Sequence, residues 1–155
     1  MFNYIIAFSC VIATSIIGSL FTTKNTNSKW YQCIKPSITP PNIVFPIVWT
    51  ILYILIGVAF SITIKNRSNI LNFLISITLI LNIVWSYLYF GKKQISTAFI
   101  IILFMDLIGI LLIGISIYYK QNKIAYLLTP YVIWILFASV LNYLSIEKAK
   151  KCTVI

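Results

Sequence analysis

Long apolar stretches alternate with polar breaks along the whole chain. A helix that crosses about 30 Å of hydrocarbon needs about 20 mostly apolar residues, and five stretches meet this requirement. They cover residues 2–21, 45–64, 70–90, 95–118 and 124–146. The strands of a membrane barrel would instead show shorter segments of alternating polarity. We therefore predict an all-α membrane protein, with residues 1–155 forming a single domain that is a bundle of five transmembrane helices.

The connections between these spans are unequal in length. Spans two to five are joined by breaks of only a few polar residues, which makes them antiparallel neighbours. The first connection, residues 22–44, is long and contains three prolines, which stiffen a chain. We predict that this long first loop forms a shaped cover over one end of the bundle. The alternative is an interfacial segment whose Trp30 and Tyr31 belong to an aromatic belt.

Composition supports the membrane assignment. The chain is 61% hydrophobic and 9% charged, whereas soluble domains contain about 25% charged residues and disordered chains are poor in apolar residues. The 12 Lys and Arg residues against 2 acidic ones lie singly or in short groups between apolar runs. Because they form no basic stripe, we expect no nucleic-acid partner and instead expect contact with membrane lipid.

The cations also predict an orientation. Eight of them lie in the first loop, the third connection and the C-terminal tail, against four on the opposite side. Positive charge favours the cytoplasmic side, which places the first loop and the C-terminus in the cytoplasm and the N-terminus outside. A bacterial cell membrane is the first expectation, and a mitochondrial outer membrane is the alternative.

Few residues could support acid–base or metal chemistry. The chain has no His, and Asp106 and Glu147 are its only acidic residues. Cys10, Cys33 and Cys152 are far apart in sequence, so we expect neither a metal site nor a disulfide. Asp106 falls in the middle of a span, where an ionisable group is a functional candidate. It predicts either proton coupling in a transporter or, as we favour, a neutral, protonated acid that donates a hydrogen bond to a Ser or Thr.

Polar and aromatic residues recur at helical spacing within the spans. One set is Asn82, Trp85 and Tyr89 in the third span, and another is Tyr131, Trp134, Ala138 and Asn142 in the fifth. Spacings of three and four place each set on one helix face. Amide and indole N–H groups in hydrocarbon need partners, so both faces should point inward. They form either the wall of a pocket or a packed interface with interhelical hydrogen bonds.

Three separated motifs resemble the TspO/MBR family, which comprises the tryptophan-rich sensory proteins and the mitochondrial translocator protein. The motifs are Trp30-Tyr31 through Lys35-Pro36-Ser37 to Phe45-Pro46, Trp49 and Leu52-Tyr53; Leu81-Asn82, Trp85 and Phe90-Gly91; and Pro130-Tyr131, Trp134, Phe137-Ala138 and Leu141-Asn142. They occur in the family's order over nearly the whole chain. The chain departs from the family at Ile38 and Ile83, where Trp is common, and at Ile101, where Asp is expected.

The resemblance implies a pocket within the bundle that opens toward the first loop. It also implies porphyrin ligands such as protoporphyrin IX or haem, sterols, drug-like molecules and homodimers. The ligand-binding residues that carry over are Trp30, Tyr31, Pro41, Phe45, Trp49, Asn82, Trp134 and Ala138. Trp49 and Trp134 would be aromatic walls, and Asn82 would donate a hydrogen bond to a ligand carbonyl or carboxylate. A loose sterol pattern is formed by Leu141, Tyr143 and Lys148.

Three functions follow from this picture. The first is binding of porphyrin or another flat hydrophobic molecule for transport or sensing, with no required cofactor. The second is degradation of porphyrin with light and oxygen, in which Trp49 and Trp134 would act as redox partners, because no catalytic nucleophile–base pair is present. The third is a membrane subunit that binds no ligand and assembles with a partner. We favour the first.

Overall fold

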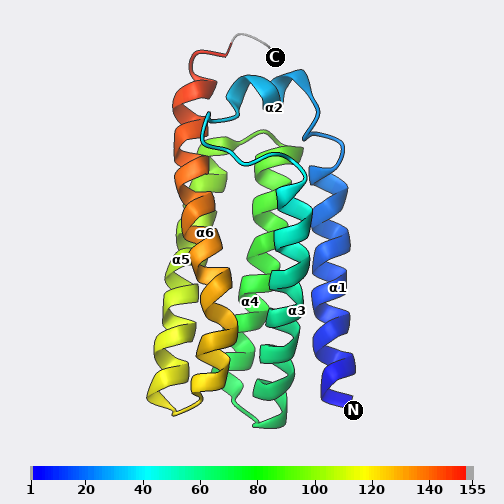
Figure 1. The fold of residues 1–155 in the computed structure, drawn as a ribbon, viewed down its shortest axis with the longest axis vertical. Coiled ribbons are helices and arrows are strands. Elements are labelled where there is room, and N and C mark those ends of the chain that lie inside the picture. The colour runs from blue at the N-terminus through cyan, green and yellow to red at the C-terminus, as the bar shows by residue number, and fades with distance from the viewer. Residues whose placement is uncertain (1, 153–155) are drawn as a thin grey trace.

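The computed structural model describes residues 2–152, which form five long helices and one short helix (Figure 1). The long helices are α1 (Phe2–Thr22), α3 (Val44–Lys65), α4 (Asn69–Ser86), α5 (Ile95–Tyr118) and α6 (Asn122–Ala149). A π-helical turn, η1 (Tyr87–Gly91), continues α4, and α2 (Lys29–Ile34) lies within the first loop. All five expected spans are confirmed as helices long and apolar enough to cross a membrane. The protein is therefore a multi-pass integral membrane protein.

The five long helices form a closed ring. The main contacts join α1 to α3, α3 to α6, α6 to α5, α5 to α4 and α4 back to α1. Most large side chains on the outside of the ring are apolar and exposed; examples are Ile12, Ile54, Phe104 and Ile133. Lipid is the natural solvent for such an outer surface. The ring therefore has an apolar outside and a separate interior in which a site can form.

Short turns join the helices at their ends. After α3 and α5 the chain turns through Arg67 (φ 54°) and Lys120 (φ 57°). The N–H of the next residue then reaches back to the helix: Ser68 bonds to the Thr63 carbonyl at 3.0 Å, and Gln121 to the Ser116 carbonyl at 2.7 Å. These are the bonds of a Schellman cap, which satisfy carbonyls left free at a helix end. Such caps end α3 and α5 within a few residues of their apolar spans.

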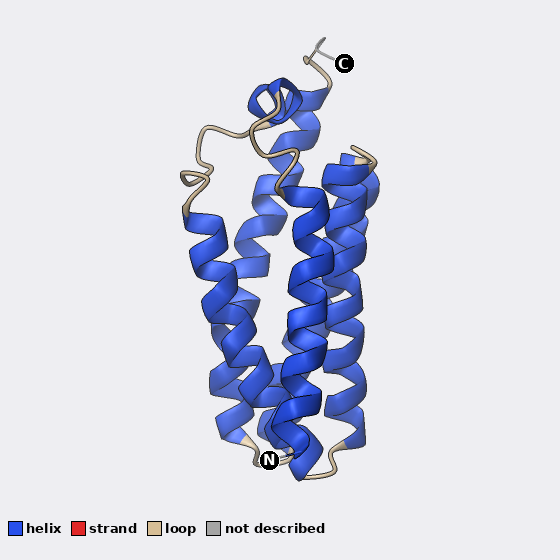
Figure 2. Ribbon diagram, turned by 90° about the vertical axis from the view of Figure 1, so that its right-hand side faces the viewer, coloured by secondary structure: helices blue, strands red, loops and turns tan. Residues whose placement is uncertain are grey.

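Helix α2 and the chain around it lie across one end of the ring (Figures 1 and 2). Ser28 caps α2 by accepting a hydrogen bond from the Tyr31 N–H at 3.1 Å. Tyr31 and Ile34 of α2 are buried in a small cluster with Tyr89 and Phe90 of η1. The predicted shaped cover is thus present, and we call residues 28–42 the lid.

A disulfide joins the lid to the end of α6, which corrects the expectation that the cysteines stay unpaired. Cys33 in α2 is bonded to Cys152, with 6.1 Å between the Cα atoms and 119 residues between them in sequence. Cys10 is free and exposed on α1. Sequence spacing gave no sign of the pair, because the two segments meet only after the lid folds over the ring.

The disulfide predicts a specific labelling pattern. When cells are treated with a permeant thiol reagent and the protein is then denatured without reductant, Cys10 alone should carry the label. Reduction before labelling should expose Cys33 and Cys152 as well. Intact-mass measurement counts the labels, and Cys33→Ser is the control that leaves Cys152 reactive. Labelling of all three cysteines without reductant would contradict the bond.

Gly57 allows α1 to approach α3 closely, and this predicts a stability difference. A Cβ at Gly57 would lie 3.0 Å from two ring atoms of Phe8, whereas one at Gly114 would meet nothing within 4 Å. We expect Gly57→Leu to lower the unfolding free energy by about 1–3 kcal/mol because it overpacks this contact. Gly114→Leu, on an exposed part of α5, should change it little. Thermal unfolding of both variants in the same lipid or detergent is the measurement, and equal effects would contradict the packing argument.

Candidate functional site

A cavity of about 350 Å³ lies beneath the lid, at the loop end of the ring. This volume falls within the range of small-molecule sites. Six of the eight expected ligand-binding residues line it, namely Tyr31, Phe45, Trp49, Asn82, Trp134 and Ala138. They come from the lid and from α3, α4 and α6, so one cavity brings together residues far apart in sequence.

Trp30 and Pro41 are the two expected residues that do not line the cavity. The Trp30 ring packs against the Tyr89 ring with 6.2 Å between centroids, and the Lys93 ammonium lies 5.4 Å from the centroid of the Trp30 ring. Pro41 is exposed in the turn before α3, where its carbonyl accepts the Val44 N–H at 2.9 Å. Both residues shape the lid from outside the cavity.

The loose sterol pattern does not form one surface. Leu141 is buried and lines the cavity, while Tyr143 is exposed and contacts Phe99 with 5.8 Å between ring centroids. Lys148 donates a hydrogen bond to the Lys35 carbonyl at 2.7 Å. The three residues therefore serve different neighbours, and the structure gives no support to a shared sterol site.

One wall of the cavity is aromatic. Phe45 meets Trp134 edge-on with 5.7 Å between centroids, and Trp49 packs on Tyr53 at 5.2 Å. The expected roles of Trp49 and Trp134 as aromatic walls agree with these positions. Ala138 lies one turn from Trp134 on the same face of α6, where a larger side chain would occupy cavity space. This wall suits a flat apolar ligand, because stacked and edge-on contacts favour ring faces.

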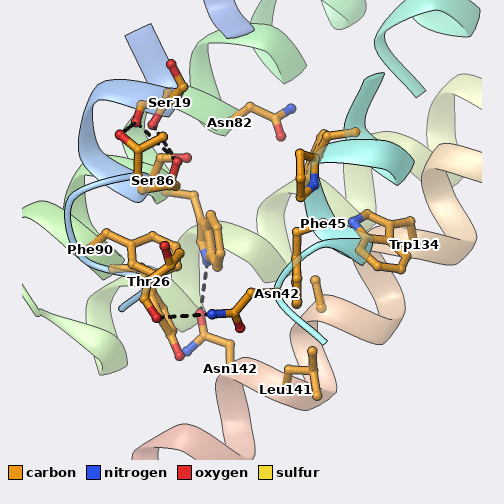
Figure 3. A pocket seen from close by; sticks show the side chains of 18 of the residues that line it. Ser19, Thr26, Asn42, Phe45, Asn82, Ser86, Phe90, Trp134, Leu141 and Asn142 are labelled. Atoms are coloured by element: carbon orange, nitrogen blue, oxygen red, sulfur yellow. Dashed lines mark hydrogen bonds between the residues drawn. The ribbon is translucent and has the colours of Figure 1, made fainter. Parts of the chain in front are cut away.

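The opposite wall carries hydroxyl groups that sequence reasoning missed. Ser15, Ser19 and Thr22 of α1 and Ser86 of α4 line the cavity, and Figure 3 shows Ser19 and Ser86 together across from Phe45 and Trp134. These hydroxyls could have been found from the sequence, because small residues recur in α1 at spacings of three and four and therefore share one helix face. Helix α1 carries no charged residue and no Trp, so its sequence indicated only a membrane span.

Hydrogen bonds join the inward faces of α4 and η1 to that of α6. The Trp85 indole N–H donates to Asn142 Oδ1 at 2.9 Å, and the Tyr89 hydroxyl donates to Ser145 Oγ at 2.8 Å. Asn142 in turn donates to the Ile95 carbonyl at 3.0 Å. The sequence left open whether these faces form a pocket wall or a packed interface. In the structure they do both, because they are joined by interhelical hydrogen bonds and also line the cavity.

Asn82 makes two further buried hydrogen bonds, one of them between α4 and α6. Its Nδ2 donates to the Thr78 carbonyl at 2.9 Å and to the Tyr131 hydroxyl at 3.2 Å. Tyr131 is fully buried, and Asn82 is 4% exposed. Asn82 Nδ2 thus makes two hydrogen bonds within the bundle, and its hydrogen bond to a ligand carbonyl or carboxylate stays a prediction.

Asp106 lies outside the cavity wall. Its Oδ2 accepts a hydrogen bond from Ser139 Oγ at 2.6 Å, so the expected Ser partner is present, with Ser139 as the donor. Asp106 Oδ1 is buried without a partner among residues 2–152. Because Asp106 does not touch the cavity, the geometry favours a hydrogen-bonding role over proton coupling to a cavity ligand.

The lid carries the polar groups nearest the cavity mouth. Lys35 Nζ donates to Asn42 Oδ1 at 2.9 Å, and Asn42 lines the cavity. Tyr31 also lines it, and burial raises the pKa of the Tyr31 phenol, which keeps this group neutral. The mouth therefore offers one cation and several neutral polar groups above an apolar interior.

Comparison with known proteins identifies the family. The TspO/MBR family profile matches residues 6–146. The chain is 37% identical over 137 residues to the tryptophan-rich protein TspO of Archaeoglobus fulgidus, which covers 86% of this chain and 88% of that one. It is 34% identical over 137 residues to the protein of the same name from Chlorobaculum tepidum (85% and 86% covered). It is 30% identical over 118 residues to the tryptophan-rich sensory protein of Cereibacter sphaeroides (74% and 73% covered). With its five-helix ring and a family match over nearly its whole length, the chain belongs to the TspO/MBR family.

Proposed function

We propose that the cavity binds a flat, mainly apolar ligand of the porphyrin class and that the protein transports or senses this ligand. The observation that carries the proposal is a lid-covered cavity with one aromatic and one hydroxyl-bearing wall. Burial of apolar surface at about 25 cal/mol per Å² would supply most of the affinity. A sensing role accords with the name of the Cereibacter sphaeroides relative.

The carboxylates of a porphyrin would lie at the lid. Lys35 approaches a lining residue of the cavity, and Lys29 begins helix α2. The chain contains no His to ligate a haem iron. Ring packing against Trp49 and Trp134 and carboxylate contacts to the lid lysines are therefore the proposed binding forces, and protoporphyrin IX is the first ligand to test.

The titration with protoporphyrin IX described below also distinguishes the other ligands and functions that the sequence suggested. Sterols and drug-like molecules share the apolar character that the cavity accepts. Degradation of a bound porphyrin under light and oxygen would depend on Trp49 and Trp134. Assembly as a subunit without a ligand would leave every probe unbound.

We propose a bacterial cell membrane as the location. The excess of cations favours an orientation with the first loop and C-terminus in the cytoplasm and the N-terminus outside. The Cys33–Cys152 bond favours the opposite arrangement, because disulfides persist in oxidising compartments. Thiol labelling of intact cells with permeant and impermeant reagents distinguishes the two orientations.

Filling the cavity should weaken porphyrin binding. We expect saturable quenching of Trp fluorescence when protein in nanodiscs is titrated with protoporphyrin IX in the dark. Ala138→Phe should weaken this binding at least about tenfold, because the added ring occupies the ligand's space. Val140→Phe is the matched control, since Val140 lies on the same helix and is 50% exposed. Linear quenching that neither variant changes would indicate partition into lipid and refute the proposal; later illumination of a bound sample tests for degradation.

Breaking the disulfide should speed ligand exchange. In Cys33→Ser the lid loses its covalent attachment to α6 and keeps only weaker contacts, such as the bond from Lys148 to the Lys35 carbonyl. We expect both association and dissociation of protoporphyrin IX to become severalfold faster, because lid opening controls access to a covered site. Stopped-flow fluorescence measures both rates, and Cys10→Ser should match the wild type. Unchanged rates in Cys33→Ser would show that the ligand enters without movement of the lid.

A further inference from the structure

Four cations lie at the end of the ring opposite the lid. Lys65 is the last residue of α3 and Arg67 lies in the turn after it, while Lys120 follows α5 and Lys123 lies in the first turn of α6. All four residues are exposed, and Figure 1 shows both turns at the same end of the bundle. We call these four residues the basic turn surface.

A glutamine joins the two turns. Gln121 Oε1 accepts a hydrogen bond from Asn66 Nδ2 at 3.0 Å, and Gln121 Nε2 donates to Ser68 Oγ at 2.8 Å. Asn66 and Ser68 flank Arg67, and Gln121 directly follows Lys120. Two cations that are far apart in sequence are therefore held close together at one end of the bundle.

Two of the cations occupy backbone positions that glycine would fill with less strain. Arg67 has a φ of 54° and Lys120 a φ of 57°, and each lies one residue beyond the C-cap of its helix. Glycine is the usual residue there, because a Cβ raises the energy of the left-handed conformation. The five glycines all lie in the described part of the chain, and none of them has a positive φ. Both caps thus accept backbone strain and carry a cation, which favours a role for the charge.

The basic turn surface has no internal partner among residues 2–152, because none of its cations forms a hydrogen bond or an ion pair with a described residue. Most cations at the lid end differ in this respect. Lys35, Lys148 and Lys150 donate hydrogen bonds to protein atoms. Lys92 and Lys93 lie over aromatic rings. The cations of the basic turn surface therefore remain available to an anion.

That anion is external to the described chain, and its place is the membrane surface. The two acidic residues of the chain are remote, since Asp106 lies within α5 and Glu147 lies at the lid end of α6. Tyr118 and Tyr126, which lie near the turn between α5 and α6, are 79% and 76% exposed. Exposed tyrosines beside apolar spans are typical of the membrane–water interface, which is the level of the phosphates of lipid headgroups.

We propose that the basic turn surface binds the phosphates of an anionic phospholipid. The Arg67 guanidinium is suited to bidentate contact with a phosphate, and each lysine adds a point charge. Four cations in two adjoining turns match the charge of a lipid with two phosphates better than that of a lipid with one. The site lies at the other end of the bundle from the cavity, so this inference is independent of the proposed ligand.

Three lipids with a fluorescent acyl chain test the site in a neutral detergent. Phosphatidylcholine has no net charge, phosphatidylglycerol has one negative charge, and cardiolipin has two phosphates; fluorescence anisotropy measures their binding. We expect cardiolipin to bind at least about tenfold more tightly than phosphatidylcholine, with phosphatidylglycerol between them. About 1 M salt should weaken this preference severalfold, because it screens exposed charges. Equal affinities for the three lipids would overturn the proposal. Displacement of cardiolipin by an equal concentration of inorganic pyrophosphate would also overturn it, because the site would then belong to a soluble phosphate.

Two double variants assign the preference to this surface. Arg67→Gly with Lys120→Gly removes two cations and suits the left-handed backbone, so the protein should fold and bind cardiolipin about tenfold more weakly. Lys24→Gln with Lys151→Gln removes the same charge from exposed positions at the lid end and should keep the affinity within about twofold. Equal losses in both variants would overturn the assignment, because net charge alone would then account for the binding.

Thermal unfolding gives a second measurement, in which strain and charge act in opposite directions. In phosphatidylcholine, Arg67→Gly with Lys120→Gly should unfold at the same temperature as the wild type or higher, because glycine relieves the backbone strain. Added cardiolipin should raise the unfolding temperature of the wild type and leave that of the variant unchanged. An equal rise in both proteins would refute the site. If the glycine variant does not fold, Arg67→Asn with Lys120→Asn takes its place, because asparagine also tolerates a positive φ.

Discussion

The interior of this bundle depends on the need of each polar group in hydrocarbon to find its partner within the protein. Helices α4 and α6 meet that need by pairing with each other, through Asn82 and Tyr131, Trp85 and Asn142, and Tyr89 and Ser145. Interhelical hydrogen bonds of this kind contribute about 0.6–2 kcal/mol each in membranes. They also set the direction of each donor, so they determine which atoms remain for a ligand.

The cavity lies between the positions at which polar side chains of neighbouring helices are hydrogen-bonded to each other. Between the paired positions the side chains facing inward are aromatic or small, and α1 contributes hydroxyls from the other side. The result is a mainly apolar interior, in which Thr39 Oγ1 of the lid is buried without a hydrogen-bond partner among residues 2–152. A site of this kind recognises shape first and then selects by the small number of unpaired groups.

The lid has a different basis for its stability. The buried side chains of Tyr31 and Ile34 in α2 pack against η1, and the Cys33–Cys152 bond attaches the lid to the end of α6. Its remaining polar contacts are exposed or partly exposed, and such contacts add little. The covalent bond is therefore the strongest restraint on the lid.

The sequence by itself determined the five spans, because the apolar length needed to cross a bilayer is a local property of the chain. Helical spacing also identified the inward faces of α4 and α6, and the family motifs located six of the eight expected residues on the cavity wall. Only the tertiary structure decided that Cys33 meets Cys152, that α1 supplies hydroxyls, and that Trp30 and Pro41 lie outside the cavity. These features depend on which segments meet after folding and on the partner that each rotamer finds, and residue spacing along one helix contains neither piece of information.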